Sequence, residues 1–106
     1  MRRVMVRYKV KADHVATNEE LVRAVYDELQ RTQPAGLRYV TFQLDDGVSF
    51  VHLASIETED GQSPLSDVQA FKQFQENIGE RCDEAPVATE LREIGSFRVF
   101  GDQSES

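Results

Sequence analysis

One histidine in this 106-residue chain is placed where it could act as a base. His52 lies in the middle of an apolar, strand-like segment, and a histidine with an ordinary pKa of about 6.5 can remove a proton from a phenol or enol. Tyr8 and Tyr39 lie in neighbouring strand-like segments and could provide phenol hydroxyls beside it. His52, Tyr8 and Tyr39 are therefore the candidate catalytic residues. A core histidine with both ring nitrogens hydrogen-bonded gives the same pattern and is the more common case.

No other pattern in the chain points to a metal, a nucleotide or a reactive thiol. Cys82 is the only cysteine, so no intramolecular disulfide can form, and nearby carboxylates at a helix end disfavour its thiolate. His14 is far from His52 in the sequence, and the six glycines are spaced as turns, so neither a metal site nor a phosphate loop is predicted. We expect no cofactor, with Arg7 or Arg98 as the cation available to an anionic group.

The composition is acidic, with 19 Asp and Glu residues against 12 Lys and Arg residues and a formal net charge of −7. Such a field repels nucleic acids and anionic membrane surfaces, so neither is expected as a partner. Basic residues near the start, at positions 2, 3, 7, 9 and 11, are expected to form a solvated side of the first strand. Without a signal-like or membrane-spanning run, a cytoplasmic location is expected.

The length predicts a single domain at 1–100, followed by a disordered polar tail at 101–106. Alternating apolar residues predict a strand at 3–11, with Tyr8 on its apolar side. A helix is expected to follow, with Asn18 as its N-terminal cap, and to end at the Pro-Ala-Gly sequence at 34–36.

The segment 37–56 predicts a β-hairpin whose register depends on the turn at 45–47. We favour a three-residue loop with Gly47 in the left-handed region, which pairs Phe42 with Phe50 and puts both on the face that carries His52. A two-residue turn would instead place Thr41 beside His52. In both registers the hairpin has apolar residues on both faces.

A second helix is predicted to start at Ser66 or Asp67, with Phe71 and Phe74 anchoring it to the sheet. The last strand is predicted at 87–100, with a bend at Gly95. The element order is that of an α+β, ferredoxin-like βαββαβ domain with an antiparallel sheet.

Two helices can cover only one face of such a sheet. That face is assigned to the helices through their aromatic residues, and the mixed face with Thr41, Val51 and Leu53 is assigned to a second copy of the chain. The predicted partner is therefore the chain itself, as a homodimer through the sheet face.

The length, the βαββαβ order and the segment 65–74 (LSDVQAFKQF) resemble the dimeric α/β-barrel superfamily, and within it the antibiotic-biosynthesis-monooxygenase-like domains. The resemblance implies two sheets paired face to face, with helices outside. It also implies a pocket between helices and sheet, where cofactor-independent members activate an electron-rich substrate by deprotonation. The chain has no tryptophan, so the residues of the haem-degrading branch are not carried over.

Two functions follow from these observations. The first is binding of a small apolar or aromatic molecule between helices and sheet, or stabilisation of a partner protein, without catalysis. The alternative is a cofactor-independent monooxygenase, or an isomerase, acting on an aromatic or polyketide-like substrate. A cavity in front of His52 would favour the enzyme, and a close-packed interior with a fully hydrogen-bonded His52 would favour the non-catalytic module.

Overall fold

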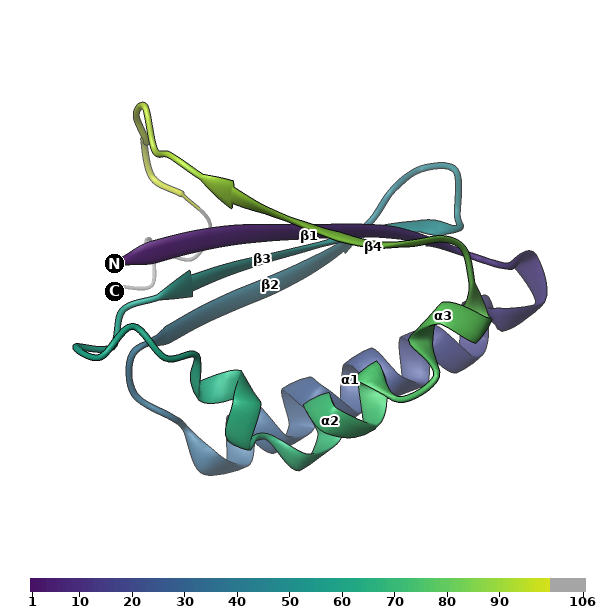
Figure 1. The fold of residues 1–106 in the computed structure, drawn as a ribbon, viewed down its shortest axis with the longest axis horizontal. Helices are drawn as coiled ribbons and strands as arrows, with labels where there is room; N and C mark the ends of the chain where they lie inside the picture. Colours follow the sequence, from purple (N-terminus) through teal and green to yellow (C-terminus); the bar gives the residue numbers. More distant parts are fainter. Residues whose placement is uncertain (100–106) are drawn as a thin grey trace.

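The computed structural model describes residues 1–99, which form a four-stranded antiparallel sheet with helices on one face (Figure 1). The strand order β2-β3-β1-β4 is that of the ferredoxin-like βαββαβ fold, as the sequence predicted. The elements are β1 (Arg2–Val10), η1 (Ala12–His14), α1 (Val15–Thr32), β2 (Leu37–Gln43), β3 (Ser49–Ile56), η2 (Pro64–Asp67), α2 (Gln69–Gln75), α3 (Ile78–Arg81) and β4 (Cys82–Leu91).

Strand β1 lies in the middle of the sheet, between β3 and β4, and its residues alternate as predicted. Tyr8 and Val10 are buried toward the helices, whereas Arg7 is exposed on the opposite side. Because side chains alternate along a strand, Arg2 shares the helix-facing side of β1 with Val6 and Tyr8.

Helix α1 begins at Val15, three residues before the predicted cap. Asn18 therefore does not cap the helix; it lies inside α1 and is fully buried. It occupies the same helix face as Val25, because residues seven apart lie two turns apart on one stripe. The helix ends where expected, at Thr32. The next residue, Gln33, has a left-handed conformation, and its backbone N–H donates to the carbonyl of Leu29 (2.8 Å).

The favoured hairpin register is wrong, and the alternative register is present. Thr41 pairs with His52, and Phe42 pairs with Val51 on the face away from the helices. The turn sets this register: the Asp46 carboxylate accepts hydrogen bonds from the backbone N–H groups of Val48 (3.0 Å) and Ser49 (2.8 Å). This Asp46 cap closes the loop at 44–48, in which Gly47 has the left-handed φ of 79° that was predicted.

The predicted second helix is divided into three short pieces, η2, α2 and α3. The Ser63 side chain accepts a hydrogen bond from the Leu65 N–H at the start of η2, and extended backbone at Val68 separates η2 from α2. Glu28 of α1 then accepts hydrogen bonds from Gln69 N–H (3.0 Å) and Ala70 N–H (2.9 Å), so a neighbouring helix caps α2.

The last strand begins and ends earlier than predicted, because β4 spans Cys82–Leu91. Its pairing with β1 slips in register between Arg7 and Lys9, which accommodates Pro86 at the sheet edge. Residues 92–99, which include the predicted bend position Gly95, form no strand and lead away from the sheet, on the side opposite the helices (Figure 1). The bend in this segment lies at 97–98. Phe100 and the predicted tail at 101–106 lie outside the described residues.

The core lies between the helices and one face of the sheet. Its buried members include Tyr8, Phe50 and Phe74, and Phe71 packs against them from α2, so both predicted anchors contact the sheet side. Within residues 1–99, no helix is both long and apolar enough to cross a membrane.

Candidate functional site

His52 lies at the centre of the helix-facing side of the sheet, and both nitrogens of its ring have hydrogen-bond partners. Its side chain is buried, with 5% of the residue exposed. Nε2 lies 2.8 Å from the Tyr8 hydroxyl, and Nδ1 lies 2.6 Å from the Tyr39 hydroxyl and 3.1 Å from Thr41 Oγ1. The structure therefore brings the three predicted site residues, His52, Tyr8 and Tyr39, into direct contact across three adjacent strands.

The Nε2 side of His52 is closed by α1. Asn18 Nδ2 donates to the Tyr8 hydroxyl oxygen (2.9 Å), and both residues are fully buried. Because that oxygen accepts from Asn18, its own proton can be donated to His52 Nε2, which places the proton of the neutral ring on Nδ1. The fixed chain Asn18–Tyr8–His52 thus orients the imidazole.

The Nδ1 side of His52 is more open. Thr41 Oγ1 lies 2.7 Å from the Tyr26 hydroxyl of α1, so the hydrogen-bonded chain continues from Nδ1 toward the helix. Tyr26 also stacks on Tyr39, with ring centroids 5.4 Å apart. Tyr26 and Thr41 line a second, shallower hollow of about 260 Å³.

Burial sets the protonation states in this cluster. It lowers the pKa of His52 to about 4, so the imidazole is neutral at pH 7. Burial raises the pKa of Tyr8 to about 12 despite the Asn18 hydrogen bond, and it raises the pKa values of Tyr39 and Tyr26 above their usual range. The resting site is therefore uncharged, with two phenols around a neutral base.

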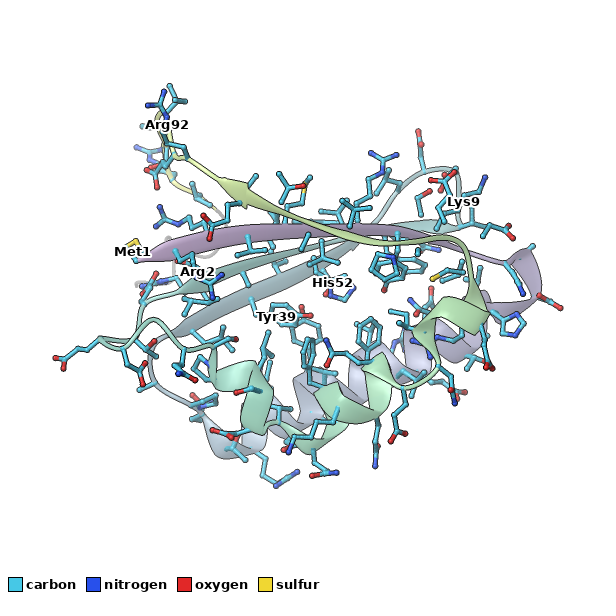
Figure 2. All side chains as sticks on the ribbon, in the orientation of Figure 1. Met1, Arg2, Lys9, Tyr39, His52 and Arg92 are labelled. Atoms are coloured by element: carbon cyan, nitrogen blue, oxygen red, sulfur yellow. The ribbon has the colours of Figure 1, made fainter. Side chains whose placement is uncertain are left out.

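A cavity of about 550 Å³ opens beside this cluster, between the sheet and the η2–α3 segment. Tyr39 and His52 line it, and Figure 2 shows them projecting into the layer between sheet and helices. Phe71 and Phe74 of α2 form part of its wall, with the Phe74 ring 5.3 Å from the imidazole. The other lining residues are Arg2, Val4, Val6, Ala54, Ile56, Ser63, Leu65, Ser66, Gln75, Ile78 and Pro86.

The two cations suggested for the site are not brought to it. Arg7 is exposed on the opposite face of β1, and Arg98 lies in the segment after β4, over the ring of Phe97. Within residues 1–99, Arg2 is the cation that lines the cavity.

Sequence reasoning also missed three polar side chains of the cluster: Asn18, Tyr26 and Thr41. Asn18 falls on the apolar stripe of α1 together with Leu21 and Val25, and a polar residue in such a stripe is the signal that could have identified it. Thr41 was weighed beside His52 only in the register that was not favoured.

No family model and no curated protein matches this chain. Solved structures do match in fold. A Nitrosomonas europaea protein assigned as an antibiotic biosynthesis monooxygenase has a TM-score of 0.72 and 16% identity, over 90% of this chain and 100% of that one. A protein of unknown function from the same organism has a TM-score of 0.69 and 11% identity, over 91% of each chain.

The cofactor-independent oxygenase SnoaB from Streptomyces nogalater, in a mutant form, also matches this chain. It has a TM-score of 0.65 and 13% identity, over 90% of this chain and 94% of SnoaB. At such identities the likeness establishes the fold and leaves the activity open. This chain has the ferredoxin-like fold of the antibiotic-biosynthesis-monooxygenase-like proteins.

Proposed function

We propose that the chain binds a small, largely apolar aromatic molecule in the cavity between the sheet and η2–α3. The observation that carries this proposal is the cavity itself: about 550 Å³, lined mainly by apolar side chains, with Tyr39 and His52 as a polar group at its inner wall. Its volume falls within the range of small-molecule sites, roughly 300–1,000 Å³. Phe71 and Phe74 offer ring faces and edges against which an aromatic ligand can pack.

The hydrogen-bond pattern supports a ligand that carries a phenol, enol or carbonyl oxygen. With Nδ1 of His52 protonated and donating to the Tyr39 oxygen, the proton of Tyr39 is left for an acceptor in the cavity. Since burial keeps both groups neutral, they can orient an oxygen atom without the cost of burying a charge.

Binding of 2-naphthol, followed by calorimetric titration, tests the proposal. Ala54 lines the cavity, so Ala54→Phe should fill part of it and weaken binding at least about tenfold, which corresponds to about 1.4 kcal/mol. Ala16→Phe, on the exposed side of α1, is the matched control and should bind like the wild type. Equal affinities of the two variants, or no binding by the wild type, would reject the cavity as the ligand site.

The second candidate is a cofactor-independent oxygenase, and the contact between Tyr39 and His52 at the cavity wall favours it. This reaction needs the other tautomer of the imidazole, with its proton on Nε2 and donated to the Tyr8 oxygen, so that Nδ1 is an acceptor. Nδ1 would then take the proton of an enolisable ketone through the Tyr39 hydroxyl, and dioxygen would oxidise the resulting anion. Anthrone plus dioxygen would give anthraquinone plus water. A base with a pKa of about 4 is weak, so only an acidic substrate, with its anion stabilised nearby, suits it.

Oxygen consumption with anthrone separates the two candidates. His52→Gln should lower the rate at least roughly a hundredfold, the usual scale of a general base, while Tyr26→Phe should keep most of it. If the wild type binds anthrone but consumes no oxygen above the uncatalysed rate, the chain is a binding module for this compound class.

We also propose that two copies pair through the bare face of the sheet. That face carries Met5, Val40, Val51 and Leu53, and its edges expose the apolar side chains of Phe42, Val87 and Leu91. Exposed apolar surface of this extent is typical of an interface, and a flat sheet face can pair with itself about a two-fold axis.

A further inference from the structure

The cavity has a charged end as well as a neutral polar end. Among its lining residues Arg2 is the one side chain that carries a charge at pH 7, since His52 is neutral there. Among the residues that the structure describes, no carboxylate lines the cavity, although the chain as a whole has 19 acidic residues. The cavity therefore has one cationic side chain and no carboxylate in its described lining, which favours an anionic group on the ligand.

The two ends are held apart by strand geometry. Val6 pairs with His52, and Arg2 lies four residues before Val6 on the same face of β1. At roughly 3.3 Å per residue the two backbone positions are about 13 Å apart. Val4 and Ala54, which pair with each other, line the cavity between them, and Ile56 lies opposite Arg2, so an apolar floor separates the two polar ends. Figure 2 shows Arg2 and His52 at separate points of the same layer.

Arg2 is held loosely enough to change partner. Its Nη1 lies 3.5 Å from a carboxylate oxygen of Glu90, and both side chains are substantially exposed. Such an exposed ion pair contributes little to stability. Its Nη2 donates to the Gly61 carbonyl at 3.5 Å, the long limit of a hydrogen bond. A guanidinium group fits a carboxylate with two parallel hydrogen bonds, which a ligand could offer in place of Glu90.

We propose that the ligand is an elongated aromatic acid, with a phenol or carbonyl oxygen at Tyr39 and His52 and a carboxylate at Arg2. The inference rests on the proposed cavity site and adds the chemical class of its ligand. The charged end selects among apolar molecules of similar size, because an uncharged analogue leaves Arg2 with only Glu90 and water.

The test compares 6-hydroxy-2-naphthoic acid with its methyl ester, a pair of similar shape that differs in charge, by titrating the naphthol fluorescence. The acid should bind at least about tenfold more tightly than the ester, the lower limit for a charge-assisted hydrogen bond. Arg2→Gln should remove this preference by weakening the acid alone. Glu90→Gln, which removes the competing carboxylate, should strengthen the acid alone.

Arg3→Gln is the matched control, because Arg3 has the same charge but lies on the opposite side of β1, where it pairs with Glu93. It should leave both affinities unchanged. Equal binding of acid and ester by the wild type, or equal losses in the Arg2 and Arg3 variants, would overturn the proposed ligand class while leaving the cavity site intact. Failure of both compounds to bind would overturn the site and the ligand class together.

Discussion

The two faces of the sheet differ in their side chains and in what covers them. The helix-facing side joins Tyr8, Tyr39, Thr41 and His52 in one hydrogen-bonded cluster and leaves a cavity beside it. Within residues 1–99, the opposite side has no helix over it and presents apolar side chains interspersed with basic ones, Arg3, Arg7 and Lys9 of β1 and Arg38 of β2.

This difference shows how a short chain can combine stability with a binding site. A cavity reduces what side-chain packing on its face contributes to the stability of the fold, because the residues that line the cavity lack van der Waals contacts on that side. Burial of the bare face against a second copy would offset that loss, because apolar area removed from water contributes roughly 25 cal/mol per Å². We therefore expect substitutions on the bare face to change dimerisation, and substitutions on the cavity face to change the stability and protonation of the His52 cluster.

The largest effect is expected from Leu53→Lys on the bare face. An ammonium group at the centre of the interface would be buried beside the like charge of Arg7, a diagonal neighbour of Leu53 on β1, so dimerisation should weaken by more than about a hundredfold. Sedimentation equilibrium at micromolar concentration should show a wild-type dimer and a monomeric variant. Ala16→Lys, which adds the same charge at an exposed position of α1, should stay dimeric. A monomeric wild type would remove the assembly role given to this face.

The next largest effect is expected from His52 on the cavity face, which makes the free energy of unfolding of the domain depend on pH. Its pKa is about 4 when folded and about 6.5 when unfolded, so between these values the unfolded state binds the additional proton. The free energy of unfolding should therefore fall as pH decreases from about 6.5 to 4, by on the order of 3 kcal/mol in total. Urea titrations at several pH values measure this slope.

The variant His52→Gln should lack most of the slope above about pH 4.5, because the glutamine side chain at this buried position does not titrate. Below that pH both proteins should lose stability, since Asp46 and Glu57 have lowered pKa values when folded. Identical slopes in the two proteins between about pH 5 and 6.5 would contradict a buried, neutral His52.

Much of the cavity face could be predicted from the sequence. Alternation assigned Tyr8 to the inner side of β1, and aromatic spacing assigned Phe71 and Phe74 to the helix that covers it. The hairpin register could not be predicted, because its apolar pattern fits both faces and the Asp46 side chain selects between them through two backbone N–H groups.

Residues with two plausible roles were also misassigned. Asn18 has the side chain of a helix cap, yet the helix starts earlier and Asn18 bonds to Tyr8, a contact between elements that local sequence does not encode. Arg2 was grouped with the solvated basic residues of the first strand. Its even position instead places it on the cavity side with Val4 and Val6.

An effect smaller than the pH effect of His52 is expected from Tyr8→Phe, which keeps the ring and removes the hydroxyl between Asn18 and His52. Two buried polar atoms, Asn18 Nδ2 and His52 Nε2, would lose a partner, so the free energy of unfolding should fall by about 1–3 kcal/mol. Urea unfolding at pH 7 measures the loss. Asn18→Leu should lower the free energy of unfolding less in the Tyr8→Phe variant than in the wild type, because the hydrogen bond between Asn18 and Tyr8 is already absent there.

The smallest effect is expected from Tyr26→Phe, at the half-buried end of the same chain of hydrogen bonds. This change removes one contact, to Thr41, and water in the shallow hollow beside Tyr26 can replace it. Stability should therefore fall by only about 0.5–1.5 kcal/mol, the net value of one ordinary hydrogen bond. The urea midpoint of Tyr26→Phe should lie between those of the wild type and Tyr8→Phe. A loss equal to that of Tyr8→Phe would mean that the Nδ1 side of His52 is as closed as the Nε2 side, and the cavity could not exchange partners with the imidazole there.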